Sequence, residues 1–445
     1  MKKFIAKKLG LQLFDILKGY KVTAYYNFYL QTLKWNREEI ENHQLVKLRQ
    51  LLNHAYQNVP FYKKRFDEIN FDVNIKSLSD LENIPPLTRE DIQNNFDELL
   101  DKKFDLSKCY KGSSSGSTGQ PVFYYHDVDG SSSGIAANYF GWFLGGWEFG
   151  QSGITIWGNP RVVNVEWKRF TSKIKSRLFF RDKFPAYKLT ETEKFNELIE
   201  ILKQKNYSYI DGYTNAIYLL ADYVYKKNIK LNKFKQILTT GENLQDYQRA
   251  VIENVLGPVY DGYGCGEING IAHQCKICKE YHIIEPHVIV ESNDNTSGED
   301  GSSALLITDL TNYVMPLIRY QNGDMAVLAS GNKCSIKYKS LHSISGRISD
   351  VIDLPGGGNL VVPSFFGSML LKQVTNIKHY QIEKVSDDKI IINLVLSNKL
   401  SDEDYKKISD SLYEYLGKKL LWEIKIVDKI QVSKTGKFKL LVDRT

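Results

Sequence analysis

The stretch QILTTGENLQDYQRAVIENVLGPVYDGYG (residues 236–264) joins two β-rich segments through a helical one. QILTTGE and GPVYDGYG carry β-branched and aromatic residues, whereas NLQDYQRAVIENVL between them has apolar residues at helical spacing. The same alternation occurs upstream, where EKFNELIEILKQK (193–205) precedes SYIDGY (208–213). Strands that alternate with helices favour an α/β domain with a largely parallel sheet.

The length and the C-terminal pattern indicate more than one domain. The chain has 445 residues, and a single core rarely grows beyond about 250–300 residues. Near the C-terminus, KIIINLVLS (389–397) and LWEIKIVDKI (421–430) read as strands on either side of an amphipathic helix at 402–418. We expect a basic amphipathic N-terminal arm (1–37), a large domain (38–348) with mixed sheets, and a small α+β domain (349–445).

The charge of the chain is concentrated in its N-terminal arm. The net charge is +7, and residues 1–22 carry six lysines against Asp15, which gives six minus one, or +5. The rest is nearly balanced and has no basic stripe, so we expect no nucleic-acid partner. The arm fits two alternatives, a helix on an anionic membrane surface or a helix packed on the main body. Leu11 and Phe14, which fall among the lysines, favour packing. Other apolar residues of the arm recur at helical spacing: Ile5, Leu9, Leu13, Ile16 and Leu17.

The sequence favours a cytoplasmic protein, with association at the inner membrane face left open. No apolar run approaches the roughly 18–20 residues that span a bilayer. Lysines and Asp15 interrupt the N-terminal apolar stretch, which argues against a secretory signal. Five cysteines, an odd number, argue against a disulfide framework.

A glycine- and hydroxyl-rich segment, KGSSSGSTGQP (111–121), is a candidate phosphate loop. Its three glycines let the backbone turn N–H groups toward an anion, and its five serine and threonine hydroxyls add donors. No Gly-Lys-Ser/Thr ending follows, so this is not a Walker A loop. By composition alone a flexible loop is the commoner interpretation. The order SSSGSTGQP, however, resembles the phosphate-binding motif of the adenylate-forming superfamily.

Further motifs of that superfamily follow in the same order. They read YGCGE (263–267), YQNGD (320–324), GRISD (346–350) and SKTGK (433–437). The segments LLNHAYQNVPFYKKRF, SLSDLENIPPLTREDIQNN and MPLIRYQNGD are similar to the phenylacetate–CoA ligase branch, and its relatives in polysaccharide (capsule) biosynthesis look nearest. The resemblance covers nearly all of residues 40–445.

The resemblance implies an enzyme that activates a carboxylic acid with ATP as an acyl-adenylate. Glu267 would hold Mg²⁺, Asp324 would accept hydrogen bonds from the ribose hydroxyls, and Arg347 would contact the nucleotide. Lys437 would reach the α-phosphate and the substrate carboxylate, and with Glu267 and Thr118 it would form the catalytic set. The remaining expected nucleotide contacts are Ser114, Ser115, Gly116, Ser117, Gly119, Gly241, Glu242, Asn243, Tyr263 and Gly264.

One departure from the family pattern and one feature of the domain arrangement bear on this assignment. Gly241, Glu242 and Asn243 stand where Gly-Ala-Glu is usual, which leaves the adenine contacts open. Lys437 and the phosphate loop also lie on different expected domains, so they meet only if the small domain closes about a hinge. The resemblance implies that this mobile domain rotates about the Asp350 region between adenylation and acyl transfer.

The segment HQCKICKEYH (273–282) is a candidate zinc site. Cys275, Cys278 and His282 have spacing that suits tetrahedral zinc, although a lone Cys-x-x-Cys is also found in redox sites or incidentally. Relatives carry a Cys-x-Cys before the hinge, of which Cys334 remains here. We expect a structural Zn²⁺ held by Cys275, Cys278, His282 and Cys334, with His273 and Cys265 in reserve.

The acid and its acceptor stay open at this stage. NYFGWFLGGW (138–147) and residues beside Gly241 are candidates for an acyl pocket, although aromatic runs more often form core. The acceptor is a thiol such as CoA, or an amine or hydroxyl on a sugar or carrier protein. The competing interpretation is a catalytically inactive homologue that binds nucleotide or serves as a scaffold, against which Glu267, Asp324 and Lys437 argue.

Overall fold

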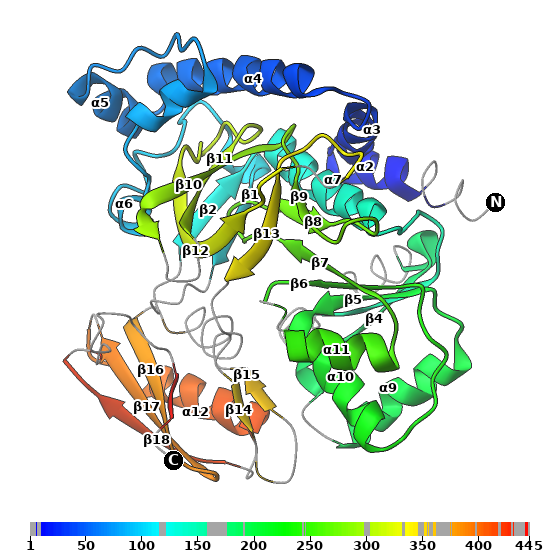
Figure 1. Ribbon diagram of the computed structural model, residues 1–445. Coiled ribbons are helices and arrows are strands. Elements are labelled where there is room, and N and C mark those ends of the chain that lie inside the picture. Colours follow the sequence, from blue (N-terminus) through cyan, green and yellow to red (C-terminus); the bar gives the residue numbers. More distant parts are fainter. Residues whose placement is uncertain are drawn as a thin grey trace.

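The structure, a computed structural model, confirms an α/β protein with a large sheet-rich N-terminal part and a separate C-terminal domain (Figure 1). It describes residues 6, 10–114, 122–157, 176–189, 192–242, 244, 246–297, 303–331, 334–345, 351–353, 355, 359–361, 374, 376–396, 398–416, 420–428, 430 and 441–443. The expected hinge at 346–350 lies outside these residues, so the expected domain bounds stay a prediction.

The large part is built on one mixed sheet. Among the described residues this sheet has eleven strands in the order β10-β11-β12-β13-β9-β8-β7-β6-β5-β3-β4. Five neighbouring strands are parallel: β3 (Gly153–Ile156), β4 (Arg181–Phe184), β5 (Tyr209–Tyr213), β6 (Gln236–Thr240) and β7 (Val259–Tyr263). The others pair antiparallel: β8 (Ala272–Gln274), β9 (Tyr281–Ile283), β10 (Val288–Ser297), β11 (Ser303–Asp309), β12 (Tyr320–Leu328) and β13 (Ser340–Ser345).

The parallel half forms because apolar strands alternate with amphipathic helices. The helices are α9 (Thr192–Gln204), α10 (Thr214–Lys226) and α11 (Asp246–Val255). Leu198 of α9, Ile217 of α10 and Ile237 of β6 are fully buried in one core that these elements share. The predicted strand–helix alternation is therefore confirmed, and it brings the carboxyl ends of β5, β6 and β7 to one edge, where α/β proteins commonly bind ligands.

The antiparallel half packs against N-terminal helices and a hairpin. The helices are α3 (Val22–Thr32), α4 (Arg37–Asn58), α5 (Pro60–Glu68), α6 (Arg89–Asn94) and α7 (Val128–Leu144). The hairpin pairs β1 (Tyr110–Ser114) with β2 (Val122–His126), so Ser114 and Val122 face each other at the root of the phosphate-loop candidate. Asp127 caps α7 by accepting from Gly130 N at 2.7 Å and also binds Tyr313 N, which ties the hairpin to the β11–β12 connection.

The C-terminal domain has its own core. Its sheet has the order β18-β17-β16-β19, with β16 (Ile377–Ser386), β17 (Lys389–Leu396), β18 (Leu421–Ile426) and β19 (Leu441–Asp443). Helix α12 (Asp402–Leu416) covers it through Ile408 and Leu412, which bury fully against the strands. A short antiparallel pair, β14 (Val351–Asp353) and β15 (Asn359–Val361), precedes it. The expected α+β character is confirmed.

The N-terminal arm folds back onto the large part. Helix α2 (Gln12–Lys18) precedes α3, and Leu11 is fully buried in a core that includes Phe140 of α7. Tyr29 of α3 is also buried, and its hydroxyl lies 2.5 Å from Ser133 Oγ of α7. No described helix has the length and apolar character to cross a membrane.

Candidate functional site

The centre of the candidate site is the buried carboxylate of Glu267, in the loop after β7. Its side chain is 2% exposed, and three groups converge on its Oε1. Ser114 Oγ donates at 2.7 Å, Tyr320 Oη at 3.0 Å and Arg89 Nη1 at 3.3 Å. All hydrogen bonds that the described residues make to this carboxylate fall on Oε1. Glu267 therefore joins the hairpin that carries the phosphate loop to β12, which carries Asp324.

Arg89 is a site residue that the sequence motifs did not reveal. It is the first residue of α6, whose N-cap Thr88 accepts from Asp91 N at 3.0 Å. From there its guanidinium reaches both Glu267 and Ser114 Oγ, the latter at 3.4 Å. Its Nε is buried and has no hydrogen-bond partner among the described residues. A cation with a spare donor beside a phosphate-loop candidate is suited to an anionic ligand. The only indication of Arg89 in the sequence was its place in LTREDIQ, within a segment similar to the phenylacetate–CoA ligase branch.

Tyr320 and His126 hold the Glu267 loop in place. Burial and the Glu267 carboxylate raise the pKa of the Tyr320 hydroxyl well above its ordinary value, so it stays a proton donor. His126 Nε2 donates to the Glu267 backbone carbonyl at 2.8 Å. Cys265 lies in the same loop, and burial raises the pKa of its thiol, so we do not assign it a nucleophilic role.

Asp324 and Tyr263 are hydrogen-bonded although their strands, β12 and β7, are not neighbours in the sheet. Tyr263 Oη donates to Asp324 Oδ2 at 3.2 Å. Asn322 Nδ2 donates to the same oxygen at 2.8 Å and to Tyr263 Oη at 2.9 Å, while Asp324 N donates to Asn322 Oδ1 at 3.0 Å. Asn322 thus orients the carboxylate proposed to hold the ribose. It belongs to the quoted YQNGD motif, but the motif by itself gave it no role.

Gly241 and Glu242 follow β6, next to aromatic rings at the ends of β3 and β5. Gly241 has φ +84°, and a Cβ there would lie 3.2 Å from the Tyr213 ring, which explains the glycine. Tyr213 stacks on Trp157 with ring centres 3.9 Å apart. Glu242 Oε2 accepts from Asn215 N at 2.8 Å, and burial raises the pKa of this carboxyl to about 7. The carboxyl ends of β3, β5 and β6 therefore present an aromatic and weakly acidic surface, and Gly264 directly follows β7, the strand paired with β6.

Several expected site residues lie outside the described part of the chain. They are Ser115, Gly116, Ser117, Thr118, Gly119, Asn243, Arg347 and Lys437. Their roles stay predictions. Of the expected nucleotide-site residues that are described, Ser114 and Glu267 lie in direct contact, and so do Tyr263 and Asp324.

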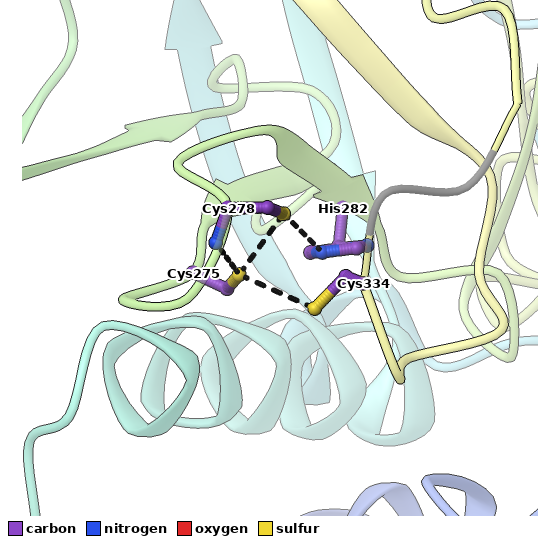
Figure 2. Close-up of side chains that lie close together, drawn as sticks. All are labelled: Cys275, Cys278, His282 and Cys334. Carbon is purple, nitrogen blue, oxygen red and sulfur yellow. Dashed lines mark hydrogen bonds between the residues drawn. The ribbon is translucent and has the colours of Figure 1, made fainter.

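The four predicted zinc ligands come together beside α7 (Figure 2). Their ligand atoms all lie within 4.8 Å of one another. Cys275 Sγ lies 3.4 Å from Cys278 Sγ and 3.8 Å from Cys334 Sγ, and Cys278 Sγ lies 3.4 Å from His282 Nε2. Cys334 comes from the β12–β13 connection, far along the chain from the other three. The sequence prediction that these residues form one cluster is confirmed.

The cluster has the dimensions and donors of a tetrahedral metal site. Zn–S bonds of about 2.3 Å give S–S edges of about 3.8 Å in a tetrahedron. Burial lowers the pKa of His282, so the imidazole is neutral, as a ligand must be. Cys278 N donates to Cys275 Sγ at 3.4 Å, and such a donor stabilises a thiolate. His273, which we expected as a reserve ligand, instead packs against Gly141 and Gly262.

The aromatic run of α7 is mainly core. Tyr139 stacks on Trp147 with ring centres 5.6 Å apart, and the Arg181 guanidinium lies 4.7 Å from the Trp142 ring centre. Arg181 is itself paired with buried Asp211 at 2.7 Å. These contacts favour the structural interpretation of residues 138–147 over the acyl-pocket one.

Comparisons with known proteins bear on the family. A family model described as the CapK C-terminal domain matches residues 357–444. Protein CapK of Staphylococcus aureus is 24% identical over 439 residues, which cover 94% of this chain and 93% of the relative. Phenylacetate-coenzyme A ligase of Escherichia coli (strain K12) is 25% identical over 383 residues, which cover 78% and 79%.

Solved structures share the fold. The crystal structure of 2-hydroxyisobutyryl-CoA ligase with 2-HIB-AMP and CoA, in its thioesterification state, has a TM-score of 0.60 at 18% identity, and the match covers 92% of this chain and 90% of that one. These findings confirm the expected resemblance to the adenylate-forming superfamily and to its phenylacetate–CoA ligase branch with CapK-like relatives.

Replacing Arg89 tests its place in the site. Arg89→Ala should lower ATP–pyrophosphate exchange by about tenfold to a hundredfold, because it removes a charge-assisted donor beside the phosphate loop. Arg89→Lys should restore part of the activity, since it keeps the charge without the planar fork. The matched control is Arg65→Ala: Arg65 is 18% exposed against 15% for Arg89, and it pairs with Asp91 instead of Glu267. Equal exchange rates in the two alanine variants would contradict the assignment.

Glu242 should give the fold a pH dependence. Its pKa is about 7 in the folded chain and 4.5 ordinarily, so between these values the folded state holds a proton that the unfolded chain releases. Stability must therefore fall as the pH rises through this window. Between pH 5 and pH 8 the free energy of unfolding should fall by about 1–3 kcal/mol more in the wild type than in Glu242→Gln. Parallel pH profiles from urea unfolding would contradict this.

Proposed function

We propose that this chain is an ATP- and Mg²⁺-dependent acid ligase that forms an acyl-adenylate and transfers the acyl group to an acceptor. The observation that carries the proposal is the contact between Ser114 at the root of the phosphate loop, Arg89 and the buried carboxylate of Glu267. The hydrogen-bonded pair Asp324 and Tyr263, from β12 and β7, would add a site for the nucleoside. Activation requires two anions, the substrate carboxylate and the phosphates of ATP, to approach each other. Arg89 and the donors beside it would reduce the repulsion between them.

Each described residue has a distinct task in this proposal. Arg89 and Ser114 would donate to the phosphates, and residues 115–119 would complete the cradle. Asp324, oriented by Asn322, would accept from the ribose hydroxyls. Glu267 fits Mg²⁺ because it is a buried carboxylate whose second oxygen accepts no hydrogen bond from the described residues, and Mg²⁺ would supply charge neutralisation at the phosphates.

The reaction would run in two balanced steps. A carboxylate oxygen attacks the α-phosphorus, and the bond from that phosphorus to the bridging oxygen breaks, so pyrophosphate leaves with the electron pair. The acceptor's sulfur, nitrogen or oxygen then attacks the acyl carbon, AMP leaves with the carboxylate oxygen, and the acceptor's proton goes to solvent. Lys437, on the C-terminal domain, would neutralise charge at the α-phosphate in the first step only.

CoA is the acceptor that we place first. Named relatives are phenylacetate-coenzyme A ligases, and the similar solved structure was obtained with an acyl-adenylate and CoA. An amine or hydroxyl on a sugar or carrier protein is the second candidate, because the resemblance extends to relatives in polysaccharide biosynthesis. ATP and CoA are available in the cytoplasm, where we place the reaction. The acid is a small molecule whose identity a substrate panel must supply.

An inactive, nucleotide-binding homologue is the competing function. It differs in one measurable respect: it would bind ATP, but it would catalyse no ATP–pyrophosphate exchange in the presence of any acid. The packed contacts of Glu267 and the retention of Asp324 and Lys437 favour the enzyme. Repeating the acid panel with CoA and with amine acceptors separates the two acceptor classes.

Substitution of Lys437 tests the adenylation role directly. Lys437→Ala should lower acid-dependent pyrophosphate release by about a thousandfold or more, because it removes the cation proposed to face the transition-state charge. The unfolding temperature should stay within a few degrees of the wild type. Lys434→Ala, in the same SKTGK motif, is the matched control and should retain most of the activity. Wild-type pyrophosphate release from Lys437→Ala would overturn the assignment.

We further propose that the Cys275–Cys278–His282–Cys334 cluster holds a structural Zn²⁺. Four protein ligands leave no open position for substrate, which is typical of structural zinc. The ion would tie the β8–β9 turn to the β12–β13 connection and so support the strands that carry Asp324. Redox work by Cys275 and Cys278 is the weaker alternative, because a third thiol and an imidazole complete the set.

Metal analysis tests the zinc proposal. The purified protein should contain about one zinc per chain, and Cys278→Ser should lower both the zinc content and the unfolding temperature. Cys109→Ser, at a thiol outside the cluster, should change neither. Less than about half an equivalent of zinc, or thermal stability unaffected by strong chelators, would contradict the proposal.

A further inference from the structure

The orientation of α2 is fixed by hydrogen bonds of Asp15, in the middle of the helix. Asp15 Oδ1 accepts from Val22 N at 2.9 Å and Asp15 Oδ2 from Thr23 N at 2.8 Å, so this one side chain caps the start of α3. Tyr20 N also donates to Asp15 O at 2.9 Å. Gly19 makes the turn between the helices with φ +67°, a conformation that glycine adopts without strain. Helix α2 therefore cannot rotate independently of α3.

Helix α3 is in turn attached to α7. Lys21 N donates to Ser132 Oγ at 2.9 Å, and Lys21 Nζ lies 2.9 Å from Asp129 Oδ2. Tyr25 Oη donates to Asp129 Oδ1 at 2.9 Å. With Tyr29 buried against Ser133, α3 is a rigid support, and it presents α2 at the edge of the molecule (Figure 1).

This attachment leaves large aliphatic side chains of α2 in solvent. Leu13 is 39% exposed, Ile16 78% and Leu17 73%. Their spacing of three and four residues puts them on one helix face. Leu11 is fully buried and Phe14 packs edge-on against Tyr20 with ring centres 5.8 Å apart, so the inward face is already occupied. Helix α2 therefore packs inward through one face and exposes aliphatic side chains on the other.

The sequence around α2 is basic. Residues 1–22 carry a net charge of +5 in the sequence, to which Lys2, Lys3, Lys7 and Lys8 contribute, and Lys18 is exposed at the end of α2. The one acidic residue of this stretch, Asp15, accepts hydrogen bonds from the backbone at the N-terminus of α3. An aliphatic face beside lysines complements a surface that is apolar beneath and negatively charged outside, which describes a bilayer with anionic lipids.

We propose that the face of α2 formed by Leu13, Ile16 and Leu17 docks the protein on an anionic membrane surface and inserts at the level of the headgroups. This inference stands apart from the proposed ligase activity, because its site and its measurement do not involve ATP. Docking would bring the enzyme to acceptors or products held at the membrane.

Flotation with vesicles tests the proposal. The full-length protein should bind phosphatidylcholine vesicles that contain phosphatidylglycerol, bind pure phosphatidylcholine at least about tenfold more weakly, and dissociate at high salt. Ile16→Ser/Leu17→Ser should weaken binding about tenfold or more while its unfolding temperature and exchange activity stay unchanged. Val46→Ser/Leu328→Ser is the matched control, since it removes two other exposed aliphatic side chains.

Four results would overturn the proposal. Three concern vesicle binding: no binding of wild-type protein to anionic vesicles, binding that survives Ile16→Ser/Leu17→Ser, or binding that the control pair abolishes equally. Concentration-dependent dimerisation in analytical ultracentrifugation that Ile16→Ser/Leu17→Ser abolishes would also overturn it, because the face would then be covered by a second copy of the chain. Substitution of Lys2, Lys3, Lys7 and Lys8 by Gln should reproduce the loss at low salt.

Discussion

The burial of one carboxylate, Glu267, is the constraint on which the candidate site depends. A carboxylate on a residue that is 1% exposed is unfavourable unless a cation and hydrogen-bond donors surround it. Here Arg89, Ser114 and Tyr320 supply them, and they come from α6, the β1–β2 hairpin and β12. Segments that are far apart in sequence therefore meet at the Glu267 carboxylate. The same contacts place the root of the phosphate loop beside the strand that carries Asp324.

Much of this could be predicted from sequence because the deciding patterns are local. Strand–helix alternation indicated the parallel half of the sheet, and ordered motifs located Ser114, Tyr263, Glu267 and Asp324. Arg89 could not be found in this way, since a single arginine after a helix cap looks like an ordinary surface residue until the fold brings it to Glu267. Asn322 was missed for a related reason: its role lies in orienting a neighbour instead of in touching a ligand.

Two other predictions depended on long-range packing. The cysteine–histidine cluster could be predicted because Cys275, Cys278 and His282 are close in sequence, while Cys334 needed the resemblance to relatives. The aromatic run of α7 has the composition of a pocket, but its rings pack on one another and on Arg181, so packing decided between pocket and core. For the N-terminal arm, the sequence already set Leu11 and Phe14 apart from Leu13, Ile16 and Leu17, and packing decided which of the two faces turns inward.

The central claim is that a carboxylate oxygen attacks the α-phosphorus of ATP in this site. Mass spectrometry of the nucleotide released from a panel of ¹⁸O-labelled acids, with Mg-ATP and CoA or an amine, tests it most directly. The account predicts AMP that carries one ¹⁸O atom for at least one acid. Release of ADP, or of AMP without the label across the whole panel, would contradict it.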